Sequence, residues 1–156
     1  MLLRAKAYLY WSIDRVEEAR RLASKALEKL GEDPQTELIL GATYLDSSTQ
    51  MAIELIRKAW EKESGLQIAA RLLGEANIRL GKFRKALRYF KKRLEQDPGQ
   101  YNVLQATAKV YLEVGQFKKA RETLEMMLAA EPSQVDALVA VSRLNTQVLD
   151  RSQRAL

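Results

Sequence analysis

The sequence predicts an all-α protein built as an α-solenoid of stacked helix–turn–helix repeats, and three observations predict this fold class. The 156 residues include only 3 Pro and 7 Gly, a composition that favours helices. Small residues, turns and prolines recur along the chain at intervals of 33 or 34 positions. Between these landmarks, apolar residues recur at steps of three and four, the spacing that places them on one face of a helix.

The repeat interval is visible in two series of small residues. The first series falls in the first predicted helix of each unit: Ala7, Gly41, Gly74 and Ala108. The second falls in the second predicted helix: Ala19, Ala52, Ala86 and Ala120. Two turn glycines (Gly81 and Gly115) and two prolines (Pro98 and Pro132) give an interval of 34. Small residues let helices approach closely, and because no unit can bury its apolar face alone, neighbouring units must stack.

Taken in order, the predicted repeats cover residues 1–33, 34–66, 67–100 and 101–134, and a helix at 135–149 begins a fifth unit. The second unit is one residue short, near positions 46–49. Pro98 and Pro132 end the second helices of the third and fourth units, because the residue before a proline is pushed out of the helical region. We expect one domain over 1–149 and a frayed tail at 150–156. The uncapped ends predict a fragment of a longer protein, whose end faces would allow self-association.

These landmarks resemble the tetratricopeptide-repeat family, whose unit is about 34 residues long. The resemblance implies a right-handed solenoid that acts as a binding scaffold. The chain also departs from the family pattern. A tryptophan near the start of each family unit is replaced here by Leu3, Glu37, Ala70 and Leu104, and Asn77 stands in place of a tyrosine.

The composition argues against catalysis. The chain contains no Cys and no His, which removes the disulfide framework, the thiolate metal site and the commonest general base. Neither a phosphate-binding glycine loop nor a nucleophile–base pair is present, so we expect no enzyme activity, no cofactor and no metal. No stretch has the length of a membrane span, and no signal peptide is recognisable at the start. Cytoplasmic and bacterial periplasmic locations are both compatible with this composition.

The resemblance implies that a protein or peptide partner binds along the concave surface formed by the first helices. Residues whose spacing places them there are Arg4, Tyr8, Trp11, Gln35, Leu38, Arg71, Glu75, Arg79, Asn102, Gln105, Lys109 and Arg143, with Ala42, Leu45, Ile68, Glu113, Asp136 and Val139 beside them. An apolar and aromatic end precedes alternating charges, as in a groove for an extended peptide or a helix. The alternative interpretation is that Arg71–Glu75 and Lys109–Glu113 are ordinary four-residue helix pairs.

Some residues narrow this hypothesis. Co-chaperone members of the family hold a C-terminal carboxylate with a Lys and an Asn four residues apart, and no Lys or Arg here is followed by Asn at that spacing. A groove-facing Glu75 would repel a carboxylate, so this mode is disfavoured. Trp11 is the better interface anchor of the two tryptophans, although it could instead pack against a preceding unit. Trp60 ends an apolar series and is expected in the core.

The densest charge run extends from Lys82 to Arg93 and contains no acid, within a net charge of +6. Helical spacing places five of its cations on one outer arc, which we term the basic patch: Arg84, Lys85, Arg88, Lys91 and Lys92. We expect it on the convex side. The favoured interpretation is a solvated face. The alternative is a site for an acidic protein or a polyanion such as acidic polysaccharide, lipid headgroups or RNA. Nucleic acid is the weakest of these, because no aromatic row accompanies the patch.

Overall fold

The computed structural model describes residues 2–133, 139, 142 and 146. Within these residues the chain is all-helical, as the sequence predicts. The eight helices are α1 (Leu2–Ser12), α2 (Val16–Leu30), α3 (Pro34–Thr43), α4 (Thr49–Lys62), α5 (Gln67–Arg79), α6 (Phe83–Gln96), α7 (Tyr101–Glu113) and α8 (Phe117–Ala130). Apart from three single residues, the predicted helix at 135–149 lies outside the described part of the chain, as does the predicted tail at 150–156.

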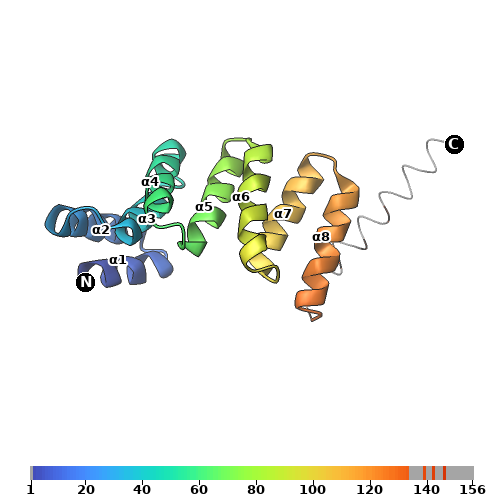
Figure 1. The fold of residues 1–156 in the computed structure, drawn as a ribbon, viewed down its shortest axis with the longest axis horizontal. Helices are drawn as coiled ribbons and strands as arrows, with labels where there is room; N and C mark the ends of the chain where they lie inside the picture. Colours follow the sequence, from blue (N-terminus) through green and yellow to red (C-terminus); the bar gives the residue numbers. More distant parts are fainter. Residues whose placement is uncertain (1, 134–138, 140–141, 143–145, 147–156) are drawn as a thin grey trace. The chain divides into compact units, whose positions relative to one another are not determined.

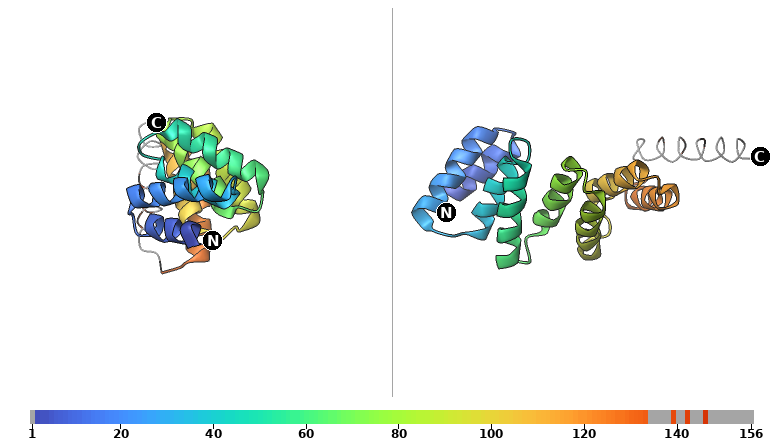
Figure 2. Two further views of the ribbon diagram at one scale, coloured as in Figure 1. Left: turned by 90° about the vertical axis from the view of Figure 1, so that its left-hand side faces the viewer. Right: turned by 90° about the horizontal axis from the view of Figure 1, so that it is seen from above.

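The helices divide into two compact units, and consecutive helices within each unit pack side by side (Figures 1 and 2). The first unit, Met1–Lys82, contains α1 to α5. The second begins at Phe83 and contains α6, α7 and α8. The helices alternate with short turns at the positions that the repeat interval indicates. The assignment of all residues 1–149 to one domain stays a prediction.

Three of the helix–helix turns share one geometry. Each places a residue in the left-handed region, with φ of 61° at Asp14, 66° at Gly81 and 73° at Gly115. In each, the following backbone N–H donates to a carbonyl five residues earlier, over 2.8 Å, as in Lys82 to Asn77 and Gln116 to Tyr111. This is the Schellman closure of a helix end, and it favours glycine because a side chain is strained there.

The turn between α3 and α4 differs. Its residues include no positive φ, and Tyr44 and Leu45 donate to carbonyls three residues back, Gly41 at 3.0 Å and Ala42 at 3.3 Å. This is the place where the sequence is one residue short. The shorter unit therefore closes by a tightened last turn and a longer loop rather than by a left-handed glycine.

The core is built on the small residues of the repeat. Ala7, Ala19, Ala52, Ala86 and Ala120 are all fully buried. At Gly41 the helices come so close that an added Cβ would lie 2.7 Å from Cγ1 of Ile56. The repeat interval therefore records where two helices touch. Trp60, which we expect in the core, is only partly buried, because its indole N–H reaches the carbonyl of Ser64 in the turn after α4.

Candidate partner-binding surfaces

A pocket in the first unit brings together the first five predicted groove residues. It has a volume of about 370 Å³ and lies between α1, α3 and the start of α5. We call it the α1/α3/α5 pocket, and its lining is Arg4, Ala5, Tyr8, Trp11, Gln35, Leu38, Ile39, Ala42, Leu66, Ile68 and Leu72. The lining is mainly apolar, and Arg4 is its one charged side chain among the residues that the structure describes.

The aromatic wall of this pocket comes from α1. Steps of four and three residues place Arg4, Tyr8 and Trp11 on one face of that helix. The rings of Tyr8 and Trp11 meet edge to face, with centroids 5.9 Å apart. Trp11 also packs against the buried cluster of Ala7, Ala23 and Ile39, whereas Tyr8 stays 54% exposed. Trp11 therefore supports the fold, and Tyr8 is the aromatic side chain most open to a partner.

The charged member of the lining, Arg4, is held in place by an ion pair with Asp33. Its Nη1 lies 3.2 Å from Oδ1 of Asp33. Asp33 is also the N-cap of α3, and its other oxygen accepts from the backbone N–H of Thr36 at 3.0 Å and from the Thr36 hydroxyl. Partial burial acts to raise the pKa of Asp33, but the bonds from Thr36 and the Arg4 charge outweigh it and hold that pKa below its ordinary value. Asp33 thus stays ionised and fixes Arg4 at the pocket edge.

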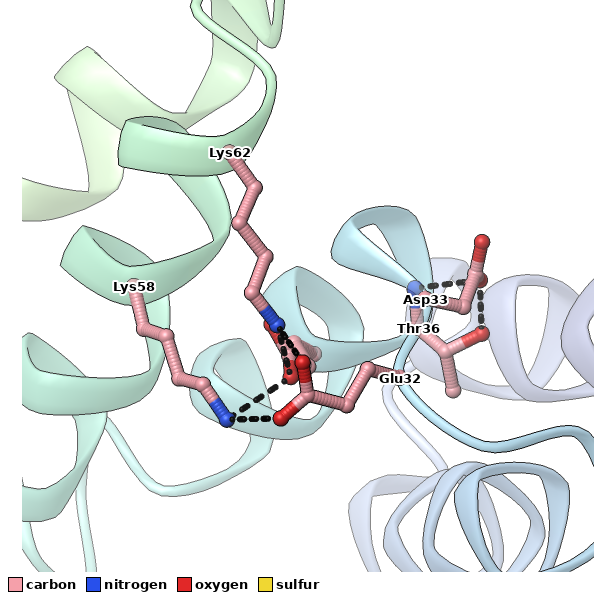
Figure 3. A network of polar contacts seen from close by, with 6 residues as sticks. Glu32, Asp33, Thr36, Lys58 and Lys62 are labelled. Carbon is pink, nitrogen blue, oxygen red and sulfur yellow. Dashed lines mark hydrogen bonds and ion pairs between the residues drawn. The ribbon is translucent and has the colours of Figure 1, made fainter.

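A network of four charged residues connects α3 and the turn before it to α4 (Figure 3). Glu37 is only 3% exposed, and its carboxylate lies 3.1 Å from Nζ of Lys62 and 3.2 Å from Nζ of Lys58. Both lysines also contact Glu32, at 2.7 and 3.0 Å. Hydrogen bonds from Lys62 and Lys58 lower the pKa of Glu32 from 4.5 to about 2. This explains the acid in place of the family's tryptophan: Glu37 is buried but compensated by two cations from α4.

Of the predicted groove residues on α5, Ile68 lines the pocket, whereas Arg71, Glu75 and Arg79 do not. Arg71 pairs with Glu75 on its own helix, as the ordinary helix-pair interpretation expects. Arg79 reaches Asp46, 2.9 Å away in the turn after α3. On α7, Asn102 and Lys109 are exposed and Gln105 is half-buried, all within the second unit. Arg143 lies outside the described residues.

Sequence reasoning missed four lining residues: Ala5, Ile39, Leu66 and Leu72. A helical-face count carried one turn further would have found two of them, since Ala5 precedes Tyr8 by three and Leu72 follows Ile68 by four. Leu66 precedes α5, and its place in the lining depends on how the chain enters that helix.

In the second unit, all five residues of the basic patch are exposed on α6. The opposite side of that helix buries Ala86, Phe90 and Arg93. Arg93 belongs to the same charge run in the sequence but is only 3% exposed, with Nη2 3.6 Å from Asp97. Arg84, Lys85, Arg88 and Lys91 form no ion pair with any residue that the structure describes.

Comparisons with known proteins agree with the helical repeat fold described above. Residues 77–141 match the family model for a tetratricopeptide repeat. A structure of MamA AMB-1 in space group P212121 superposes with a TM-score of 0.79 at 20% identity, over 99% of this chain and 85% of that one. A crystal structure of the MamA protein gives 0.80 at 20%, over 97% and 84%. MamA MSR-1 gives 0.79 at 19%, over 97% and 87%. No curated protein matches this sequence significantly.

These comparisons confirm the resemblance to the tetratricopeptide-repeat family and the fold class, an all-α fold of the α-solenoid type. Because these solved structures are only 19–20% identical to this chain, they support the fold alone. The fold and the family match support an interaction scaffold in general terms. None of the described helices has the length and apolarity needed to cross a membrane. Within the described residues, no acidic side chains gather in a group that would hold a metal ion.

Proposed function

We propose that this chain is a non-catalytic protein–protein interaction scaffold that binds a peptide or partner segment in the α1/α3/α5 pocket. The observation that carries the proposal is an apolar pocket of about 370 Å³ walled by an exposed aromatic residue. Leu38, Ile39 and Ala42 are each 6% exposed and form an apolar floor. Concave apolar sites with a few polar groups at the edge are typical binding sites in proteins.

The lining favours a partner that inserts an apolar side chain rather than a carboxylate. Tyrosine and tryptophan are the residues that most often anchor protein interfaces. The guanidinium of Arg4 is already bonded to Asp33, so an incoming carboxylate would have to compete for it. The amide of Gln35 is exposed in the same lining and can both donate to and accept from a peptide backbone. This supports an extended segment with one apolar anchor.

The non-catalytic part of the proposal is supported by the sequence. Without His or Cys, nucleophilic and general-base chemistry would depend on carboxylates, lysines and hydroxyls. The carboxylates around the pocket already serve structural roles: Asp33 caps α3 and holds Arg4, and Glu37 pairs with two lysines.

The test uses two neighbouring exposed residues of α1. Tyr8 lines the pocket and is 54% exposed, whereas Leu9 is 57% exposed and does not line it. We expect Tyr8→Ala to abolish capture of partners from cell extract, measured by quantitative mass spectrometry, and Leu9→Ala to leave capture unchanged. Arg71→Glu on α5 and Lys109→Glu on α7 then test, each by itself, whether these predicted groove residues also contribute to capture. Trp11→Ala is less diagnostic because Trp11 also packs on the core. Equal capture by wild type, Tyr8→Ala and Gln35→Ala would refute the proposal.

A second candidate function is polyanion binding through the basic patch, and the exposure of all five cations favours it. Such binding should weaken steeply with salt, because each neutralised charge releases a counterion. Reversing Arg84, Arg88 and Lys92 to Glu should abolish retention on heparin and on vesicles of phosphatidylglycerol. If retention changes neither with salt concentration nor with the three substitutions to Glu, this candidate function is wrong.

A further inference from the structure

A second pocket opens in the second unit beside the basic patch. Its volume is about 400 Å³, and it lies between α6, α7 and α8. We call it the α6/α7/α8 pocket, and its lining is Leu87, Arg88, Lys91, Leu94, Glu95, Leu104, Thr107, Tyr111, Thr123 and Met126. Two of these, Arg88 and Lys91, belong to the basic patch. The pocket and the patch are therefore parts of one surface.

The floor and the edge of this pocket have different chemistry. Leu104, Thr107 and Thr123 are buried, and both threonine hydroxyls are satisfied by carbonyls one turn back, Val103 at 2.7 Å and Lys119 at 2.8 Å. The floor thus offers apolar surface with no hydroxyl hydrogen free for a ligand. At the edge, Arg88 and Lys91 are exposed and unpaired within the described part of the chain.

The length of the lining matches a helical partner. From Leu87 to Glu95 it runs along α6 over eight steps of 1.5 Å, about 12 Å. Amphipathic helices dock into grooves through anchors at i, i+3, i+4 and i+7, which span about 10 Å and so fit within this length. Arg84 and Lys85 continue the positive charge for one further turn of α6.

The shape of the surface disfavours a lipid bilayer. Membrane-surface helices insert protruding apolar side chains between lipids. Here the apolar residues are recessed, and Met126, 46% exposed, is the one large apolar lining residue that ranks as exposed. A recess receives a protruding side chain from another molecule. The carboxylate of Glu95 in the same lining would also repel lipid phosphates.

We propose that the α6/α7/α8 pocket and the basic patch together form a second docking site, specific for an acidic amphipathic helix of a partner protein. The helix places apolar anchors over Leu104 and Thr107, and its acids face the end of α6 that carries Arg84, Lys85 and Arg88. Glu95 marks the opposite end of the lining and excludes acids there. The site accordingly selects for the direction of the helix as well as for its charge.

The test measures binding of designed peptides to the full chain by fluorescence anisotropy. The first peptide is a capped 16-residue helix with leucines at i, i+3, i+4 and i+7 and four glutamates at its N-terminal end. In the second peptide lysines replace the glutamates, and in the third serines replace the leucines. A fourth carries glutamates at both ends. A fifth reverses the first, with its four glutamates at the C-terminal end. One of the two single-ended acidic peptides should bind best, and each of the other peptides should bind at least about tenfold more weakly, because charge and burial both contribute.

Variants of the protein locate the binding. Arg88→Glu/Lys91→Glu should weaken the better acidic peptide at least about tenfold, since it replaces two attractive charges by repulsive ones. The control is Lys25→Glu/Lys29→Glu, which makes the same change in net charge at two exposed positions of α2. Glu95→Lys should let the peptide with acids at both ends bind as well as the best single-ended acidic peptide. Circular dichroism verifies that each variant remains helical.

Three outcomes would overturn the proposal. Equal binding of the leucine and serine peptides would show an electrostatic patch without a pocket. Equal weakening by the control variant would show a non-specific charge effect. Sedimentation with phosphatidylglycerol vesicles, together with no binding of any acidic peptide, would assign the surface to lipid headgroups. None of the substituted residues lines the α1/α3/α5 pocket, so weakening by Arg88→Glu/Lys91→Glu is independent of the proposed function.

Discussion

The α3–α4 and α7–α8 hairpins occupy corresponding places in the repeat but are held together by different means. In α7, Leu104 is fully buried, and the turn to α8 closes on the left-handed Gly115. At the corresponding place in α3, Glu37 is buried against two lysines, and the turn has no left-handed residue. Gly41 replaces Ala108 and brings α3 against Ile56 of α4. One architecture therefore tolerates either a hydrophobic or an ionic solution, provided that the helices can approach.

The largest effect is expected from Leu104→Ala. It removes a fully buried side chain that packs with Ala120, Leu124 and Met127, so it should cost about 2–5 kcal/mol of unfolding free energy. Urea denaturation followed by circular dichroism measures it. The matched control is Leu30→Ala, where the leucine is 57% exposed and the cost should be small. Similar losses for both would contradict a hydrophobic basis for the α7–α8 hairpin.

Next in size is Gly41→Ala. The new Cβ would meet Ile56 Cγ1 at 2.7 Å and the Ile56 backbone nitrogen at 3.1 Å, so the two helices must separate. Overpacking of this kind costs about 1–3 kcal/mol. The reciprocal change Ala108→Gly should cost only about 1 kcal/mol, through chain entropy. If Gly41→Ala is neutral in urea denaturation, the close approach is not needed.

Gly115→Ala tests how much the α7–α8 turn depends on its left-handed residue, which the α3–α4 turn lacks. With φ at 73°, an alanine there is strained by about 1–2 kcal/mol, although nothing blocks its Cβ. Gly65 has equally open space and no positive φ, so Gly65→Ala should be neutral or slightly stabilising. Thermal unfolding of the two variants side by side distinguishes backbone strain from general loop sensitivity.

Glu37→Leu replaces the buried acid of the α3–α4 hairpin with the residue type that stands at the corresponding place, Leu104, in the α7–α8 hairpin. Replacing a buried ion pair by an apolar residue of similar volume is often close to neutral, and Lys58 and Lys62 keep Glu32 as a partner. We expect a change within about 1 kcal/mol in either direction. Glu37→Ala, which leaves a cavity as well, should be clearly worse. A large loss in Glu37→Leu would mean that the carboxylate itself is required.

The smallest effect concerns pH. The pKa of Glu32 is lowered from 4.5 to about 2, so the folded state binds its proton more weakly than the unfolded state. Its contribution is full above pH 4.5 and is lost as the pH falls toward 2. Glu32 is exposed, so solvent screens the contribution and it stays small. Glu32→Gln should flatten the decline of stability in this window relative to wild type, in a series of denaturation midpoints from pH 5 to 2.5.

The features that follow the repeat interval were the ones that could be predicted from the sequence. It identified the small residues that prove to be buried and the turn glycines that prove to have a positive φ. It also predicted the five groove residues of α1 and α3 that the structure brings together in one pocket. It did not identify the partners of Glu37, because Lys58 and Lys62 lie 21 and 25 positions further along the chain. Nor did it place Trp60, whose indole N–H is drawn to a turn carbonyl. The pocket beside the basic patch was also missed, since its lining comes from three helices.

By itself, the sequence determined the periodic features of this protein: its helices, its small contact residues and the exposed arc of cations on α6. Periodicity reports which residues share a face of a helix, and that is a local property. The tertiary structure alone decided which charges are paired and where hollows remain. Arg4 is bound to Asp33, whereas Arg88 and Lys91 form no ion pair within the described part of the chain. Each of the two pockets is lined by side chains from three helices. Such pairings and gaps depend on distances between helices, which no single face of a helix records.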